Sequence, residues 1–313
     1  MVVQWALLIG LTAGASLATV VLTAVFVCWR QTKANKKPGK SMVACQCNLR
    51  LGELEPWIAG ADSIVFTDVD ETQRWGKDDI SSANAEAIKN FREHGLLIPI
   101  TGAPLWHIPP ELQGGIMYGE SGGVLQLPNK QIVELVPEEG TEAIRKLRSL
   151  LGICAMEGLD FIDGDSVLLE GPRYVSLTLV SGRHPHYPGK VGTISIEKLE
   201  ERIGRLIEDH RLPLVIRKGV ADTYSWLDIT VLFEKHNAVA CFLERTGLCG
   251  VYYLGDGAND VESIKHPCVV PVGFKNSIPE IQTTCKDHGI LIRDKDGPDG
   301  GAAEALSAIM AAL

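Results

Sequence analysis

The stretch Ile64-Val-Phe-Thr-Asp68-Val-Asp70-Glu-Thr72 decides the fold of this chain. Its first four residues are mostly β-formers, and two aspartates one residue apart follow at once. Carboxylates crowded at a strand end repel each other, so a chain keeps such a pair mainly where a cation or a chemical step needs it. The alternative is a strand that leads into an acidic turn, because Asp also favours turns. The rest of the chain separates these two interpretations.

Two further predicted strands end in groups of the same kind. One covers residues 96–100 and ends in Thr101-Gly102, and the other covers 250–254 and precedes Gly255-Asp256-Gly257-Ala258-Asn259-Asp260. Helices predicted at about 82–93 and 237–245 alternate with these strands, which indicates a parallel sheet with helices on both faces. Ligands of such sheets collect at the carboxyl ends of the strands. We therefore expect all these polar groups at one sheet edge.

More elements of the same α/β core are predicted towards the carboxyl end. They are strands at 268–272 and 290–293 and a helix at 301–312. Pro99 lies inside the second strand and removes a ladder donor, so we expect a bulge or a local edge there. The fold class predicted is a Rossmann-like, doubly wound parallel sheet.

Residues 137–233 follow a different pattern. Helices are predicted at 141–151 and 195–210, and strands at 173–180, 213–217 and 225–232. The second helix carries an apolar stripe formed by Ile196, Leu199, Ile203, Leu206 and Ile207. Two helices with several antiparallel strands predict a compact α+β insert.

The predicted sheet edge gathers four carboxylates and one lysine. The carboxylates belong to Asp68, Asp70, Asp256 and Asp260, and Lys235 begins the helix that leads to the third strand. Four acids with one lysine make a poor structural salt-bridge set. They make a good site for one Mg²⁺ ion, which takes oxygen ligands and keeps waters for a phosphate.

These motifs together resemble the haloacid dehalogenase superfamily of phosphohydrolases. Its first motif, Asp-x-Asp-x-Thr after a strand, is matched by residues 68–72, and its second, a strand ending in Ser or Thr, by residues 98–102. Its lysine is best matched by Lys235, and its Gly-Asp-x-x-x-Asp motif by residues 255–260. Lys218 is a competitor for the lysine role, but its place before the last strand of the insert favours a surface or substrate role.

The resemblance implies a role for each matched residue. Asp68 is the expected nucleophile and Asp70 the expected general acid and base. Thr101 and the amide of Gly102 would hold phosphate oxygens, and Lys235 would neutralise charge on the phosphoryl group. Mg²⁺ would be held by the Asp68 side chain, the Asp70 backbone oxygen and Asp256. Asp260 would lie close by or orient Lys235, and Asn259 would help to order its loop.

The insert resembles the α/β cap of the sucrose-phosphate and mannosyl-3-phosphoglycerate phosphatase branch. The turn Glu120-Ser-Gly-Gly123 resembles the Glu-Asn-Gly-Gly turn of that branch. In the insert, Arg183 and His184 either recognise a sugar or second anionic group or belong to a solvated loop. Two departures lie where the leaving group enters: Glu71 replaces a common Gly, and Ala103 stands where Arg is frequent.

The sequence thus predicts a Mg²⁺-dependent phosphatase that acts on a small phosphorylated metabolite, such as a sugar phosphate or a phosphoglycerate derivative. A membrane-tethered regulatory or binding protein with the same fold is one alternative, and a phosphomutase is another. The expected division of the chain is a membrane helix and basic linker at 1–41, a catalytic core at 42–136 and 234–313, and a cap at 137–233.

Composition supports an acidic globular body. The 313 residues carry a formal net charge of −9, and 45% of them are hydrophobic. Basic residues without any acid occupy positions 30–40, so the remaining body is more acidic still. An acidic body argues against nucleic acid as a partner. The eight cysteines show no zinc spacing, so we expect free thiols; acylation near the membrane is the alternative for Cys28, Cys45 or Cys47.

Residues 5–29 form an uncharged run, long enough at about 1.5 Å per residue to span a hydrocarbon core of about 30 Å. The basic stretch follows this run, so the positive-inside rule predicts a single-pass membrane protein whose catalytic body faces the cytoplasm. If Met42 is the true start, the protein is cytoplasmic. Small residues at Gly10, Gly14 and Ala18 would allow two such helices to form a weak homodimer, although small residues are common in membrane helices.

Overall fold

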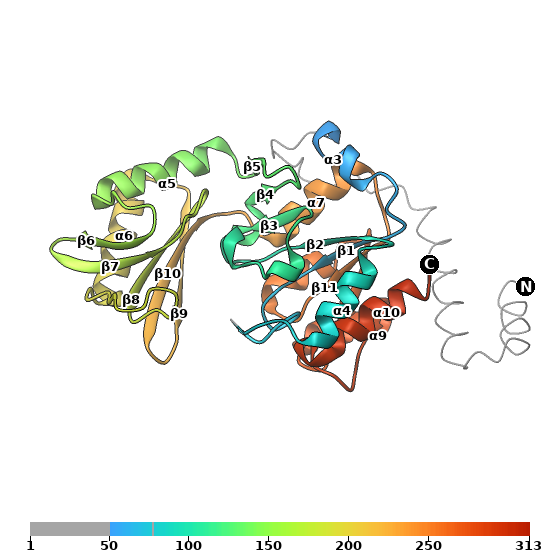
Figure 1. Cartoon of the computed structure of the whole chain (residues 1–313). Helices are drawn as coiled ribbons and strands as arrows, with labels where there is room; N and C mark the ends of the chain where they lie inside the picture. Colours follow the sequence, from blue (N-terminus) through green and yellow to red (C-terminus); the bar gives the residue numbers. More distant parts are fainter. Residues whose placement is uncertain (1–50, 77) are drawn as a thin grey trace, which may run out of the picture.

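The computed structural model of the protein describes residues 51–76 and 78–313. The predicted membrane helix and linker at 1–41 lie outside these ranges, so the anchor stays a prediction. Among the residues described, no helix is both long and apolar enough to cross a membrane. The described chain forms an α/β body with a second, smaller lobe beside it (Figure 1).

A five-stranded sheet forms the centre of the larger body. Its order is β13-β12-β11-β1-β2, and every neighbouring pair is parallel. The strands are β1 (Ile64–Thr67), β2 (Leu96–Pro99), β11 (Val251–Leu254), β12 (Val269–Gly273) and β13 (Ile290–Leu291). The chain adds β2 on one side of β1 and the later strands on the other, so the strand order reverses at β1. The predicted parallel α/β sheet is confirmed, and its switch point is the strand that leads to Asp68.

Helices cover both faces of this sheet. Phe66 of β1 packs edge-on against Phe242 of α7 (Lys235–Thr246), with ring centroids 5.2 Å apart. On the other side, α4 (Ser82–Phe91) packs against α10 (Ala302–Met310) (Figure 1). The body also contains α3 (Leu51–Ile58), α8 (Val261–Ile264) and α9 (Pro279–His288). Because both faces are covered, all four residues of β1 are buried, which is why this strand is a continuous run without polar alternation.

Pro99 is the last residue of β2, and β2 is the edge strand of the sheet. The amide of the next residue, Ile100, continues the ladder by donating to the Thr67 carbonyl at 2.8 Å. An edge position tolerates the missing proline donor. The predicted local edge is therefore confirmed.

The smaller lobe contains an antiparallel sheet in the order β6-β7-β8-β10-β9. Its strands are β6 (Gly158–Ile162), β7 (Asp165–Glu170), β8 (Ser176–Gly182), β9 (Leu214–Val220) and β10 (Tyr224–Val231). Helices α5 (Glu138–Leu151) and α6 (Ile196–His210) pack on β10. The sequence predicted both helices and three of these strands, but not β6 and β7, where glycines and aspartates interrupt the alternation.

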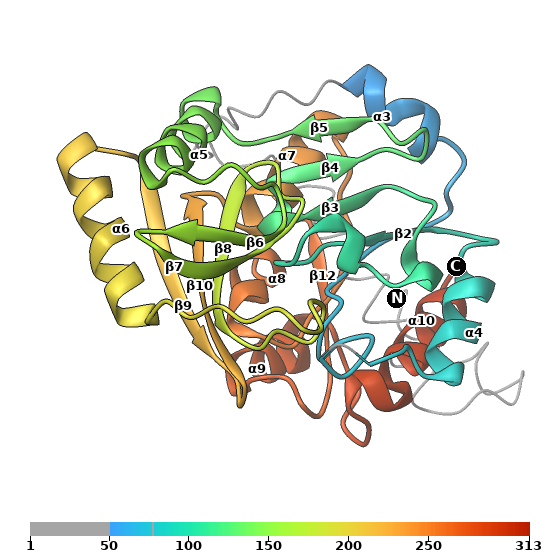
Figure 2. The same cartoon turned by 60° about the vertical axis from the view of Figure 1, so that its left-hand side comes forward.

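A short meander connects the body to α5. It consists of β3 (Met117–Gly119), β4 (Val124–Gln126) and β5 (Ile132–Glu134), which lie side by side next to β2 (Figure 2). Strands of three residues are too short to show a period in the sequence, so they were not predicted.

The cysteines only partly follow the expectation of free thiols. Cys154, Cys249 and Cys285 are free. Cys241, buried in α7, is disulfide-bonded, so the expectation is wrong for this residue. The absence of zinc-ligand spacing argued against a zinc site, but it did not exclude a disulfide bond.

Candidate active site

Lys235 lies between two carboxylates at the carboxyl end of the sheet. Its Nζ is 2.7 Å from Asp68 Oδ1 and 2.9 Å from Asp260 Oδ1, and its side chain is 1% exposed. It is the first residue of α7, whose first turn is fixed by a capping box between Glu234 and Asn237. Burial alone would lower the pKa of Lys235, but the two carboxylates outweigh it and raise the pKa. The ammonium is therefore charged at neutral pH.

Asp260 is saturated by protein donors. Its Oδ1 accepts from Lys235 Nζ and from Tyr253 Oη at 2.7 Å, and its Oδ2 accepts from the amides of Asp256 at 3.3 Å and Gly257 at 3.2 Å. The side chain is fully buried. Gly255 is required here, because a Cβ on it would lie 2.8 Å from the Asp260 carboxyl carbon. This arrangement suits a carboxylate that orients Lys235 rather than one that meets substrate.

Among the residues that the structure describes, Asp68 and Asp256 each receive hydrogen bonds at Oδ1 and none at Oδ2. Asp68 Oδ1 accepts from the Val69 amide at 2.8 Å, and Asp256 Oδ1 accepts from Thr72 Oγ1 at 2.7 Å. Burial, with Asp260 adding to it, raises the pKa of Asp68 well above its ordinary value, although Lys235 opposes the shift. Burial raises the pKa of Asp256 to about 6. Burial is the largest cause of both shifts, and the negative charge of Asp260 adds to it.

This donor set fits a Mg²⁺ ion. One ligand atom from each of Asp68, Asp256 and Asp260 lies within 4.8 Å of the others. Oxygen-only ligands suit a hard divalent cation, and the cation would relieve the excess negative charge. Because Asp260 is saturated, Asp68 and Asp256 are the carboxylates that would hold the ion.

Asp70 lies apart from this cluster. Its Oδ1 is 3.0 Å from Arg74 Nε, and about a third of its side chain is exposed. Arg74 is itself held in place by donating from Nη2 to the carbonyl of His107 at 3.0 Å. The structure thus pairs the expected proton-transfer carboxylate with an arginine. Glu71, between Asp70 and Thr72, has a φ of 61°, a backbone conformation that explains why Gly is common at this position.

The expected phosphate-binding residues lie at the end of β2. Thr101 is buried, and its Oγ1 accepts from the Ala103 amide at 3.1 Å. Gly102 is exposed and faces Ser121, whose Oγ would lie 3.7 Å from a Cβ added at Gly102. Ser121, Lys235 and Asn259 line one cavity of about 350 Å³, together with Arg217, Glu234 and Ala258. This cavity gives a ligand access to the Lys235 cluster.

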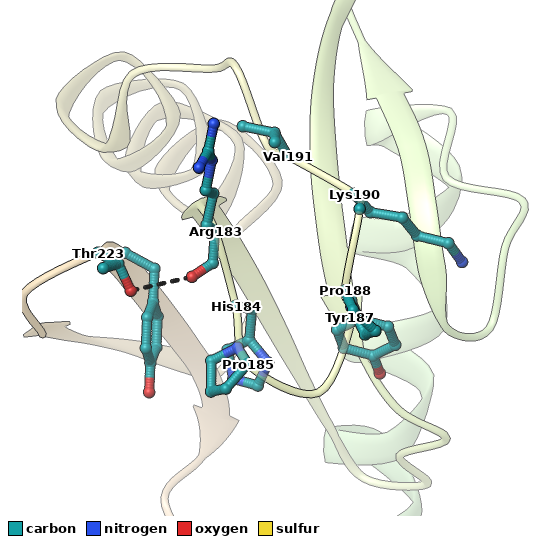
Figure 3. Close-up of a pocket in the computed structure, with 10 residues that line it drawn as sticks. Arg183, His184, Pro185, Tyr187, Pro188, Lys190, Val191 and Thr223 are labelled. Atoms are coloured by element: carbon teal, nitrogen blue, oxygen red, sulfur yellow. Dashed lines mark hydrogen bonds between the residues drawn. The ribbon is translucent and has the colours of Figure 1, made fainter.

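Arg183 and His184 line a different cavity, in the smaller lobe. It has a volume of about 460 Å³ and shares no lining residue with the cavity at Lys235. Figure 3 shows Arg183 and Lys190 pointing in different directions, so these two cations do not converge on one anion. His184 is buried, with Nε2 3.6 Å from Glu170 Oε1. Their substrate role stays a prediction.

Solved structures share this architecture. A haloacid dehalogenase-like hydrolase from Bacteroides thetaiotaomicron matches with a TM-score of 0.54 at 18% identity, over 79% of this chain and 99% of that one. A phosphatase of the haloalkanoate enzyme superfamily from the same organism matches with a TM-score of 0.51 at 15% identity, over 82% and 97%. A protein from Geobacillus kaustophilus matches with a TM-score of 0.55 at 18% identity, over 79% and 98%.

This chain has the haloacid dehalogenase fold. No protein-family model matches the sequence, and no curated protein matches it. At these identities the likeness establishes the fold, and the haloacid dehalogenase fold by itself does not establish the substrate.

Several side chains of this site were not predicted. Arg74 was missed because residues 70–74 form a turn rather than a helix, so its spacing of four residues from Asp70 was no signal for an ion pair. Tyr253 was missed because it reads as an ordinary strand residue. Glu120 was noted only as part of a turn, but its buried carboxylate accepts from the amides of Tyr174 at 2.7 Å and Val175 at 3.0 Å and from Ser176 Oγ at 2.6 Å. The contacts of Glu120 join residues 54 to 56 positions apart in sequence, so no local pattern revealed them.

Proposed function

We propose that this protein is a Mg²⁺-dependent phosphatase that hydrolyses a phosphate ester of a small metabolite through an aspartyl phosphate at Asp68. The observation that carries the proposal is the buried cluster in which Lys235 contacts both Asp68 and Asp260 beside Asp256. A charged lysine held against a carboxylate at the end of a parallel strand suits attack on phosphorus. The phosphatase among the similar structures supports the same reaction class.

Each step follows from the residues present. The Asp68 carboxylate attacks phosphorus, and the bond to the ester oxygen breaks as Asp70 gives that oxygen a proton. Asp70 then takes a proton from water, whose oxygen attacks the aspartyl phosphate and releases phosphate and free Asp68. Thr101 and the Gly102 amide hold phosphoryl oxygens, and Lys235 offsets their charge. Asp70 has to leave Arg74 to reach the leaving group.

Asp68 and Asp256, with the backbone oxygen of Asp70, would hold Mg²⁺. The ion, when bound, supplies positive charge against the phosphoryl oxygens. Lys235, held by Asp260, supplies the protein's own positive charge at the same place.

We further propose that residues 137–233 are a cap that closes over this edge, and that residues 5–29 anchor the protein in a membrane with the body in the cytoplasm. The link between lobe and body through Glu120 supports the first of these. If the full-length protein is found in the soluble fraction without detergent, the anchor is wrong.

The test is phosphate release by the purified full-length protein from a panel of phosphate esters, with Mg²⁺ and with EDTA. We expect Mg²⁺-dependent release that Asp68→Asn lowers by a factor on the order of 1,000 or more. Asp62→Asn is the matched control, because Asp62 is exposed and lies before β1. Equal activity of Asp68→Asn and the unmutated protein, or no release from any ester, would rule the proposal out. Rearranged rather than dephosphorylated products would indicate a phosphomutase instead.

A further inference from the structure

Three hydrogen bonds fix Arg74 in place. Its carbonyl accepts from the Glu71 amide at 2.7 Å, and its own amide donates to the Val69 carbonyl at 3.2 Å. Its side chain is 9% exposed and donates from Nη2 to the carbonyl of His107 at 3.0 Å. The rigid fork of a guanidinium that is held in this way cannot follow a carboxylate that moves away from it.

Asp70 contacts Arg74 instead of the cavity at Lys235. Its Oδ1 accepts from Arg74 Nε at 3.0 Å, and Asp70 is not among the residues that line that cavity. About a third of its side chain is exposed, so other rotamers are open to it. Because Arg74 is fixed, Asp70 has to break a charge-assisted hydrogen bond before it can reach a leaving group.

This contact lowers the share of molecules in which Asp70 is ready to donate a proton. A charge-assisted hydrogen bond between partly buried groups is stronger than a bond between neutral groups. When only a fraction of the molecules hold the competent arrangement, the apparent rate constant falls by that fraction. The contact between Asp70 and Arg74 therefore favours ligands that help to break it.

The smaller lobe contacts His107, the residue that anchors Arg74. Glu170 Oε1 at the end of β7 lies 3.5 Å from His107 Nε2, and the ring centroid of His186 lies 4.7 Å from that of His107. Glu170 is itself held by Arg173, which donates to its Oε2 at 2.6 Å. A displacement of the smaller lobe therefore displaces His107, and with it the carbonyl to which Arg74 donates.

We infer that Arg74 is a positioning residue that holds Asp70 away from the leaving group, and that a substrate in contact with the smaller lobe releases Asp70 by displacing His107. This inference rests on the proposed phosphatase function and adds a selection step to it. An ester too small to contact the smaller lobe leaves Asp70 on Arg74. Discrimination between small and larger esters then comes from a conformational step in addition to binding.

The test compares kcat/KM in Arg74→Gln and in the unmutated full-length protein with Mg²⁺. The esters are ethyl phosphate, p-nitrophenyl phosphate and the ester that is hydrolysed fastest in the phosphate-ester panel. We expect kcat/KM for ethyl phosphate to rise about tenfold, because Asp70 no longer has to leave an arginine. p-Nitrophenolate departs without a proton, so its ester should change by less than about twofold. A merely structural role of Arg74 would not separate the two esters.

Arg92→Gln is the matched control. Arg92 is a partly buried arginine of the larger body, and it donates to the carbonyls of Leu112 at 2.8 Å and Gln113 at 2.9 Å. It should leave the relative kcat/KM values of the esters unchanged. Arg74→Lys keeps a positive partner for Asp70, so its kcat/KM for ethyl phosphate should stay close to that of the unmutated protein.

A second pair of variants tests the link through Glu170. Glu170→Gln weakens the contact with His107, so kcat/KM for the fastest ester should fall about tenfold while that for ethyl phosphate changes little. Adding Arg74→Gln should restore kcat/KM for the fastest ester, because Asp70 is then already released. A loss of activity caused by lower stability would not be restored by a second substitution.

No rise in kcat/KM for ethyl phosphate in Arg74→Gln, or an equal rise for p-nitrophenyl phosphate, overturns the inference while the phosphatase stands. A Glu170→Gln variant that Arg74→Gln does not restore overturns it as well. If Arg74→Gln does not fold, an unchanged kcat/KM for the fastest ester in Glu170→Gln overturns the inference by itself. Absence of hydrolysis from every ester overturns both the inference and the phosphatase.

Discussion

Asp256 shows how burial changes the proton affinity of a carboxyl group in this site. Burial raises its pKa from 3.8 to about 6, even though Thr72 donates a hydrogen bond that favours the ionised form. An acid with a raised pKa binds its proton more tightly in the folded state than in the unfolded chain. It therefore adds stability below the unfolded pKa and loses that contribution as pH rises through the folded pKa. Asp68 shifts in the same direction.

In EDTA, the free energy of unfolding should fall as pH rises from about 4 to about 7, by about 3 kcal/mol for Asp256 alone. Asp256→Asn should remove that part of the slope, and excess Mg²⁺ should flatten the slope in the unmutated protein by binding the ionised carboxylates. Urea unfolding across this pH range measures all three. Stability that rises with pH in EDTA would contradict the assigned shift.

At the scale of elements, helix α7 positions Lys235 and is itself fixed by the turn at 120–123. Gly122 has a φ of +88°, and a Cβ added there would lie 2.6 Å from the Cβ of Ala238 in α7. Turn and helix thus approach as closely as a glycine allows. The turn Glu120–Gly123, which resembles a family motif, therefore also has a packing role. It contacts α7, the helix that carries Lys235.

Gly122→Ala should destabilise the protein by about 2 kcal/mol or more, because it adds both backbone strain and overlap with Ala238. Gly204→Ala provides the opposite control. Gly204 lies inside α6 with nothing within 4 Å of an added Cβ, so alanine there should stabilise by about 0.5–1 kcal/mol. The denaturant midpoints of the two variants measure these changes in stability. A similar shift of the midpoint in both variants would contradict the packing role of Gly122.

At the scale of the molecule, Glu120 joins the two lobes. Glu120 belongs to the larger body and is 4% exposed. Its carboxylate accepts hydrogen bonds from three donors of the segment 174–176, which leads into β8 of the smaller lobe. The same segment follows Arg173, whose Nη1 lies 3.5 Å from the Gly102 carbonyl, so the contact also sets where β8 stands relative to Gly102. Charged acceptors hold such donors more strongly than neutral ones.

Glu120→Ala should leave these donors without their acceptor and destabilise the protein by about 3 kcal/mol or more. Amide hydrogen exchange at Tyr174 and Val175 should speed up more than exchange in β1, because the lobe loosens locally before the body unfolds. Glu139→Ala, at an exposed site of α5, is the control. If amide exchange accelerates equally in both lobes, the substitution lowers global stability and does not specifically loosen the contact between the lobes.

The order of residues along the chain was enough to predict the parallel α/β core and the groups at its edge. Each of these depends on local order: an apolar run, a turn residue, and a carboxylate directly after a strand, as at Asp68 and Asp256. The folded structure was needed to show that Asp260 accepts from Lys235, that Arg74 pairs with Asp70, and that Glu120 accepts from the segment 174–176. Strands β3 to β7 also emerged only there. The contacts of Asp260 and Glu120 join segments that are distant in sequence, and the Asp70–Arg74 pair depends on the shape of a turn. Their geometry comes from packing and leaves no period in the chain.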